Sequence, residues 1–281
     1  MTPPTKPAAI SETASELSYS DITSHRPSLL FVILGGFFIA NALIAELIGV
    51  KIFALEPTLG IPPLDFNLFG EIGALQFSAG VLLWPVVFIM TDILNEYYGK
   101  RGIRLLSYLT MGLIVYAFVM IYLAIGLVPA DWWQTQYSVS GVPDMQAAFA
   151  SVFGQGMLII VGSVLAFLLG QLIDVLVFHR IKQATGEGKI WLRATGSTIV
   201  SQLVDTVVVL LIAFKLGPTL TGLAEPWPWS RLLAVITVQY TYKFIVVVLM
   251  TPVIYWVHAR IERFLGPDLS HRMRLAATSW D

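Results

Sequence analysis

Six long apolar stretches limit what this chain can fold into. Each is long enough for the roughly 20 residues that an α-helix needs to cross a bilayer. Of its 281 residues, 56% are hydrophobic and only 12% are charged, and the mean hydropathy of +0.76 is too high for a soluble domain. The sequence therefore predicts an all-α polytopic membrane protein, a bundle of six transmembrane helices at residues 28–53, 73–97, 103–128, 154–178, 194–216 and 230–257.

The remaining segments define the expected domain organisation. Residues 1–27 mix Pro, Ser, Thr and acidic residues without hydrophobic periodicity, so we expect a disordered cytoplasmic tail rather than a secretory signal. Residues 28–265 are the predicted transmembrane domain, and residues 266–281 a cytoplasmic C-terminal tail. Residues 144–155 have two interpretations, a short N-capped helix on the outer surface or the start of an overlong fourth span.

The charges in the loops orient the predicted spans. Thirteen of the seventeen Lys and Arg residues lie on one side, in the two tails and after the second and fourth spans. The opposite loops, at residues 54–72, 129–153 and 217–229, contain no Lys or Arg. By the positive-inside rule the basic side is cytoplasmic, and both termini are expected there.

Composition and spacing argue against several function classes. A net charge of −1 provides no basic face for nucleic acid, and the absence of cysteine rules out disulfides, thiolate metal sites and cysteine nucleophiles. The four histidines are scattered rather than grouped at metal-ligand spacing. The glycine-containing run at 186–189 lacks the flanking residues of a phosphate-binding loop. We therefore expect no metal, no cofactor and no enzyme activity.

Two copies of one polar tetrad lie in the fourth and fifth predicted spans, Gln171–Asp174 and Gln202–Asp205. An ionisable group within a transmembrane helix costs roughly 3 to more than 10 kcal/mol, so it faces a partner or an aqueous cavity rather than lipid. Small residues recur every four positions before each acid: Gly162, Ala166 and Gly170 in one span, Ser197 and Ser201 in the other. Such seams favour close packing within one protomer or in a homodimer, with the acids as interhelical polar contacts.

Depth along the helices predicts an ion pair near the bilayer midplane. With a rise of about 1.5 Å per residue, Asp205 lies roughly 16 Å from the inner end of its span, and Lys243 roughly 18 Å from the outer end of the sixth. Asp205 is therefore the nearest counter-charge to Lys243 by level. Gln239 lies one helical turn from Lys243 on the same face.

The other acids have a simpler interpretation. Asp174 lies only roughly 6 Å deep by the same measure. Asp92 and Glu96 form an i, i+4 pair close to the basic run at 100–104, so they could be the polar end of a helix.

The first span and the prolines add less specific signals. Asn41, Glu46 and Lys51 are spaced five apart, so they cannot share one narrow helix face, and Lys51 could snorkel to the outer interface. Trp84-Pro85 and Thr251-Pro252 are predicted inside the second and sixth spans, where each proline removes a helical hydrogen bond. Broken helices of this kind often contribute to transporter sites, although proline kinks are also ordinary in membrane helices.

Several motifs together resemble one family. They are Asn41 and Lys51, Trp84-Pro85 followed by the run Thr91–Lys100 (Thr-Asp-Ile-Leu-Asn-Glu-Tyr-Tyr-Gly-Lys), the run Ala166–Arg180, Trp191-Leu192-Arg193, Ser197-Thr198 and the run Ser201–Thr206. The sequence is similar to the queuosine precursor transporter family, also called the vitamin uptake transporter family. The resemblance implies a six-helix importer in a bacterial inner membrane, carrying 7-deazaguanine precursors of queuosine such as 7-cyano-7-deazaguanine. It also implies functional roles for Asp92, Glu96, Asp174 and Asp205.

The polar residues suit such a base. A deazaguanine presents a ring N–H and an exocyclic amine that one carboxylate can accept as a pair, and its carbonyl needs a Gln or Lys donor. We expect Asp205 or Asp174 to bind the donor edge. The full predicted substrate-binding set is Asn41, Lys51, Asp92, Glu96, Gln171, Asp174, Gln202, Asp205, Gln239 and Lys243.

Energy coupling and mode of action leave alternatives. Glu46, Asp92, Asp174 and Asp205 taken against Lys51 and Lys243 leave an excess of negative charge, which favours proton-coupled uptake. Facilitated diffusion with intracellular trapping is the rival. A second function class is a substrate-binding membrane subunit for a vitamin or nucleobase that works with a separate ATP-driven module. An intramembrane enzyme would need a nucleophile with its base, or a metal cluster, and neither is predicted.

Overall fold

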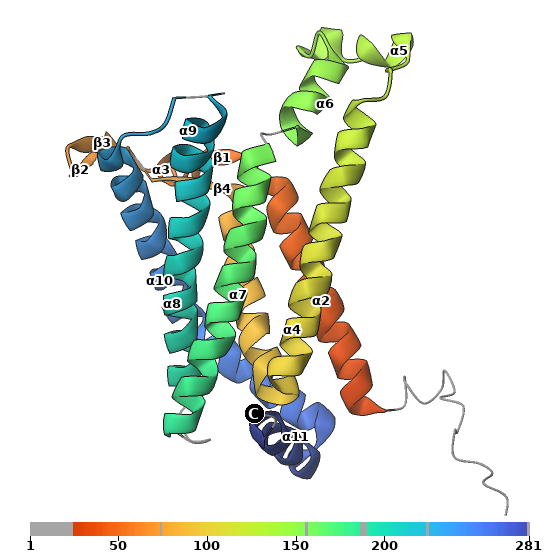
Figure 1. Cartoon of the computed structure of the whole chain (residues 1–281), viewed down its shortest axis with the longest axis vertical. Helices are drawn as coiled ribbons and strands as arrows, with labels where there is room; N and C mark the ends of the chain where they lie inside the picture. The colour runs from red at the N-terminus through yellow and green to blue at the C-terminus, as the bar shows by residue number, and fades with distance from the viewer. Residues whose placement is uncertain (1–24, 74, 155–156, 186–189, 223–224, 280–281) are drawn as a thin grey trace, which may run out of the picture.

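The computed structural model describes residues 25–73, 75–154, 157–185, 190–222 and 225–279 (Figure 1). Five helices in this part are long and apolar enough to cross a membrane. They are α2 (Arg26–Ile48), α4 (Trp84–Ile125), α7 (Met157–Thr185), α8 (Ile190–Leu211), which continues through a π-helical turn and α9 (Gly217–Thr221), and α10 (Trp229–Leu265). The prediction of a mostly α-helical polytopic membrane protein is confirmed. The disordered tail predicted at the N-terminus lies, up to residue 24, outside the described residues.

Helix α4 is a helical hairpin. Its 42 residues would extend about 63 Å if straight, twice the hydrocarbon thickness of a bilayer. The hydroxyls of Thr91 and Ser107 both lie within 3.5 Å of the same Gln171 oxygen, whereas a straight helix would separate these residues by about 24 Å. The chain therefore turns back at Gly99, the one position in α4 with non-helical torsions (Figure 1). Its two limbs, residues 84–98 and 100–125, correspond to the second and third predicted spans.

A C-terminal helix packs on this turn. Gly99 has φ 64° and ψ −171°, a combination that is essentially restricted to glycine. A Cβ atom at Gly99 would lie 3.0 Å from the carbonyl oxygen of Ala277, which belongs to α11 (Pro267–Ser279). The predicted C-terminal tail thus contains a helix that is held against the Gly99 turn.

The segment between α2 and α4 differs from prediction. Its elements are β1 (Ile52–Ala54), α3 (Leu55–Thr58), β2 (Phe66–Leu68), β3 (Glu71–Gly73), β4 (Gln76–Ser78) and the 3₁₀ helix η1 (Ala79–Leu82). β1 pairs antiparallel with β4, with Ile52 opposite Ser78, and β2 pairs with β3. The first predicted span ends at residue 53 and the second begins at residue 73, so short strands and η1 replace the expected helix on both sides of the predicted loop. A Cβ atom at Gly80 would lie 2.5 Å from the carbonyl oxygen of Ala45, so glycine permits the close approach that this segment makes to α2.

The two prolines of the predicted spans behave differently. Pro85 occupies the first turn of α4, where its missing N–H removes no helical hydrogen bond. The expectation that Pro85 lies inside a span and removes a helical hydrogen bond is wrong, because this proline begins a helix. Pro252 does lie inside α10, as predicted.

The end of the molecule opposite α11 carries the long loop after α4. It contains α5 (Asp131–Gln134), the 3₁₀ helix η2 (Ser138–Ser140) and α6 (Met145–Phe153) (Figure 1). The backbone N–H of Ala147 donates to the Asp144 carboxylate at 3.0 Å, a typical N-cap. Of the two interpretations of residues 144–155, the short N-capped helix is confirmed.

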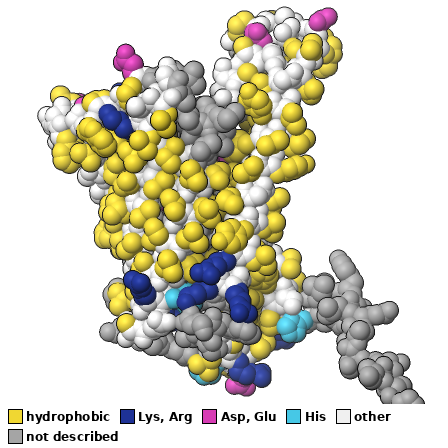
Figure 2. Space-filling model, viewed as in Figure 1, with side chains coloured by type: hydrophobic (Ala, Val, Ile, Leu, Met, Phe, Trp, Pro, Cys, Tyr) yellow, Lys and Arg dark blue, Asp and Glu magenta, His cyan; other side chains and the backbone are white. Residues whose placement is uncertain are grey.

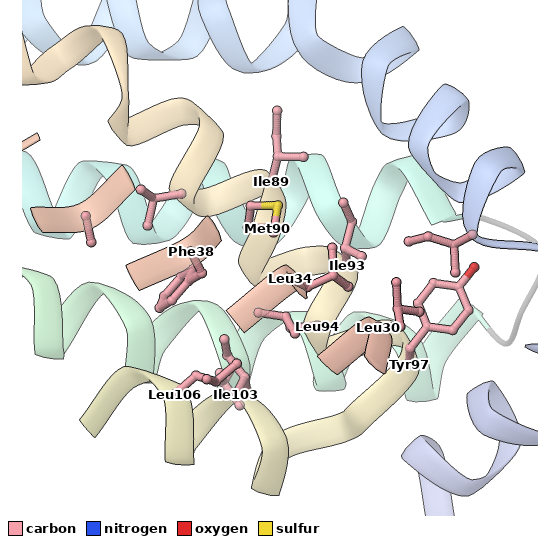
Figure 3. Close-up of a cluster of buried hydrophobic side chains, with 14 of the residues drawn as sticks. Leu30, Leu34, Phe38, Ile89, Met90, Ile93, Leu94, Tyr97, Ile103 and Leu106 are labelled. Atoms are coloured by element: carbon pink, nitrogen blue, oxygen red, sulfur yellow. The ribbon is translucent and has the colours of Figure 1, made fainter. Parts of the chain in front are cut away.

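The hydrophobic core joins α2 to both limbs of α4. Its buried side chains include Leu30, Leu34, Phe38, Ile89, Met90, Ile93, Leu94, Tyr97, Ile103 and Leu106 (Figure 3). Apolar side chains also cover the outer middle zone of the molecule, and Lys and Arg gather at the end that carries α11 (Figure 2). This zonation is what a lipid bilayer selects.

Candidate functional site

Buried polar side chains form a column between α4, α7, α8 and α10, which we call the polar column. Its members are Thr91, Asp92, Asn95, Glu96 and Ser107 on α4, Gln171, Asp174 and Lys182 on α7, Ser197, Thr198, Ser201, Gln202, Asp205 and Thr206 on α8, and Lys243 on α10. Lipid offers no hydrogen bonds to such groups, so each needs a partner inside the protein or in a ligand.

The ion pair predicted from helix depth is present. Lys243 Nζ lies 2.7 Å from Asp205 Oδ2 and also donates to the Thr206 hydroxyl at 3.0 Å. Both charged side chains are buried. The pair links α8 to α10, as the count of residues along each span predicted.

The other two aspartates bind hydroxyl groups of α8. Ser201 donates to Asp174 at 3.2 Å, while Ser197 and Thr198 donate to Asp92 at 3.3 and 3.1 Å. Carboxyl groups from α4 and α7 thus meet on one face of α8. Both aspartates are buried in the interior rather than lying at a polar helix end.

Several atoms of the column have no hydrogen-bond partner among the described residues. They are Nε2 of Gln171, Oδ2 of Asp174 and both side-chain amide atoms of Asn95 and Gln202. A buried polar atom without a partner costs about 1–3 kcal/mol, and native proteins contain few of them. Their concentration on three adjoining helices marks the place where a polar ligand would be stabilised. Asn95 was not predicted as a site residue, although it lies within the family-like run Thr91–Lys100.

A second ion pair lies nearer the basic end. Lys182 Nζ is 3.5 Å from Glu96 Oε2, and both side chains are buried. Lys182 also donates to the main-chain oxygen of Arg274 on α11 at 3.5 Å. Sequence reasoning counted Lys182 as a loop charge. The signal that could have found it is its spacing, because eight residues after Asp174 place it on the same helix face.

Three predicted site residues lie outside the column. Lys51 is exposed, because α2 ends at Ile48 and the chain turns toward β1. Asn41 is buried, but its amide donates to the Phe37 carbonyl of its own helix at 2.8 Å. Gln239 is half-buried, one turn from Lys243. The structure therefore brings together seven of the ten predicted residues, namely Asp92, Glu96, Gln171, Asp174, Gln202, Asp205 and Lys243.

The small-residue seams pack α7 against α8 within one chain. A Cβ atom at Gly170 would lie 3.5 Å from Asp205 Cβ, and one at Gly162 would lie 3.1 Å from the Ile212 side chain. This close approach brings the two tetrads into one site.

Comparisons with known proteins identify relatives of this chain. Residues 78–257 match the model of the family described as "Putative vitamin uptake transporter". The chain is 32% identical over 146 residues to the "Probable queuosine precursor transporter" of Bacillus subtilis (strain 168), covering 51% of this chain and 59% of that protein. It is 26% identical over 167 residues to the "Queuosine precursor transporter" of Escherichia coli (strain K12), covering 59% of this chain and 66% of that protein.

The matched regions stop short of the relatives' full lengths. The chain covers less than two thirds of either relative. No solved structure matches the chain. The family model nevertheless spans more than half of the chain, from β4 into α10, and confirms the resemblance drawn from the motifs. The chain belongs to the vitamin uptake transporter family, whose description is that of a transporter and not of an enzyme.

Proposed function

We propose that this chain imports queuosine precursors, 7-deazaguanines such as 7-cyano-7-deazaguanine, across a bacterial inner membrane. The names of its relatives support the substrate class. The observation that carries the proposal is the group of unpartnered polar atoms on Asn95, Gln171, Asp174 and Gln202. A ligand with several hydrogen-bonding edges would remove their desolvation cost.

The chemistry of a deazaguanine matches this group. Its ring N–H and exocyclic amine are adjacent donors that the free Asp174 oxygen can accept, and the Gln171 and Gln202 amides can donate to its carbonyl. Aromatic side chains adjoin the column. Phe88 lies 3.9 Å from the Cβ position of Gly170, and the Trp84 and Phe88 ring centroids are 6.3 Å apart. These rings supply an apolar wall for a flat heterocycle.

We propose six bilayer crossings with both termini in the cytoplasm. The two limbs of α4 supply two crossings, and α2, α7, α8 and α10 supply four. The basic end that carries α11 and the start of α2 is then cytoplasmic by the positive-inside rule (Figure 2).

We propose that proton movement drives uptake. The polar column and the half-buried Glu46 together contain five acids, Glu46, Asp92, Glu96, Asp174 and Asp205, and two lysines, Lys182 and Lys243. Glu46 accepts a hydrogen bond from Ser163 toward the outer end of the column. Acids in excess of bases along one path through the membrane are the groups that proton relays use.

Direct binding tests the substrate assignment. We expect Gln202→Leu to weaken the affinity of the purified protein for 7-cyano-7-deazaguanine by about tenfold or more, because it removes both amide contacts at nearly constant volume. The matched control is Leu203→Ala, the next residue on α8, which is exposed toward lipid. Calorimetric titration with nitrile, aminomethyl and fully modified bases measures the affinities. Equal affinities of the wild type and Gln202→Leu would remove Gln202 from the site.

Transport by the purified chain in liposomes tests the mode of action. Uptake of labelled base that needs no second protein supports a self-sufficient importer over a subunit of an ATP-driven system. Stimulation by an inward proton gradient supports coupling, whereas the same rate after the gradient is collapsed favours facilitated diffusion.

A further inference from the structure

A shallow apolar hollow lies between α2 and α10 on the outer surface of the basic end. Its volume is about 280 Å³, and it is lined by Leu30, Ile33, Trp256, Val257, Arg260, Ile261 and Phe264. Ile33 and Trp256 are 56% and 60% exposed, so the hollow opens toward lipid rather than toward the polar column.

Two arginines flank this hollow without an acidic partner. The Arg260 guanidinium lies 5.3 Å from the ring centroid of Trp256. Arg26 donates to the Phe264 carbonyl at 3.1 Å and lies 6.0 Å from the ring of the same residue. Within the described part of the chain, neither guanidinium forms an ion pair with a carboxylate.

The nearby acid of α10 is already engaged. Glu262 Oε1 lies 3.0 Å from Nη1 of Arg274 on α11. The two arginines therefore present exposed, uncompensated positive charge beside an apolar depression, at the level where Lys and Arg gather (Figure 2). A guanidinium forks two N–H groups toward a phosphate, and its stacking on an aromatic ring fixes its direction.

We infer that this hollow binds one anionic phospholipid of the leaflet at the basic end. One acyl chain lies along Leu30, Ile33 and Trp256, and the phosphate lies between Arg26 and Arg260. Charge complementarity selects this occupant, because apolar lining alone would hold a zwitterionic lipid equally well, whereas a basic pair near the membrane surface favours an anionic headgroup. The site joins the first and last long helices, so its occupancy stabilises their association.

Lipid titration of the purified full chain tests the inference. Phosphatidylglycerol with brominated acyl chains quenches a nearby tryptophan, and the part of the signal that Trp256→Phe removes reports on this hollow. We expect wild-type protein to prefer phosphatidylglycerol to phosphatidylcholine. Arg26→Gln with Arg260→Gln should weaken phosphatidylglycerol binding about thirtyfold, since each basic residue near a membrane surface contributes about fivefold. The control is Arg104→Gln, an exposed arginine at the same end that does not line the hollow.

A second variant keeps the arginines and fills the hollow. We expect Ile33→Phe, which adds bulk without adding a second tryptophan, to reduce the quenching of Trp256. Soluble glycerol phosphate should not protect the wild-type protein against thermal unfolding, which distinguishes a lipid from a free phosphate. Equal binding of the two lipids by wild-type protein, unchanged binding by the double arginine variant, or an equal loss in Arg104→Gln would each overturn the inference.

Discussion

At the scale of single residues, the buried ion pair between Asp205 and Lys243 gives the most direct test of the structure. Removing one partner leaves the other charge buried without compensation, which costs about 3–5 kcal/mol. We therefore expect Lys243→Met to lower the unfolding temperature sharply, and Asp205→Asn combined with Lys243→Met to regain most of that loss. Thermal unfolding of the wild type, the two single variants and the double variant in the same detergent gives the coupling energy of the pair.

The control for this double-variant cycle uses Lys215, which lies in the π-helical turn that continues α8. Lys215→Met removes a lysine that donates to a main-chain oxygen of Trp227, and we expect Asp205→Asn to add to it without coupling. A double variant at Asp205 and Lys243 that is no more stable than its worse single variant would contradict an ion pair.

Residue-level prediction from sequence succeeded where helix geometry alone decides. The level of Asp205 and Lys243 followed from the rise per residue, so their meeting was predictable. Lys182 was missed because the count of loop charges assigned it to the cytoplasm, while α7 extends to Thr185 and carries it into the column. Which amide atoms lack partners was not predictable, because that depends on rotamers from three helices at once.

At the scale of elements, the turn inside α4 depends on one glycine. We expect Gly99→Ala to destabilise the protein by about 1–3 kcal/mol for its backbone torsions alone, with a further cost from the clash with the Ala277 carbonyl. Gly112→Ala is the matched control, since Gly112 lies in the second limb of α4 with open space at its Cβ position. Alanine favours a helix interior over glycine by about 1 kcal/mol, so the control should be unchanged or more stable.

Proteolysis can separate a local effect from a global one. Because α11 packs on the Gly99 turn, Gly99→Ala should expose the chain near residue 266 to protease while the rest of the bundle remains resistant. The same resistance at both sites in wild type and Gly99→Ala would show that the turn tolerates a side chain.

The elements that sequence reasoning missed have one physical cause. The first predicted span ends at residue 53 and the second begins at residue 73, so β1 begins in predicted helix and β4 and η1 lie wholly in it, whereas β2 lies in the predicted loop. Strands as short as β1 and β4 leave no alternation long enough to distinguish them from helix. The signals that were available are the turn residues between them and Pro85, which marks the first turn of a helix more often than its middle.

At the scale of the whole molecule, the path of α4 decides the topology. In the proposed topology, the turn at Gly99 lets both limbs cross the bilayer, and the basic run that follows Gly99 lies on the same side as α11. Without it, α4 would cross once and Arg104 would lie within the span.

The wild-type chain has no cysteine, so single-cysteine variants report on which side of the membrane a residue lies, without background labelling. We expect Ser140→Cys, on η2, to react with a membrane-impermeant maleimide in intact cells, and Arg104→Cys and Arg272→Cys to react only in inverted membrane vesicles. All three positions are exposed, so access depends on the membrane alone. Labelling of Arg104→Cys from the side of Ser140→Cys, or from neither side, would rule out six crossings, and with them the proposal that both limbs of α4 cross the bilayer.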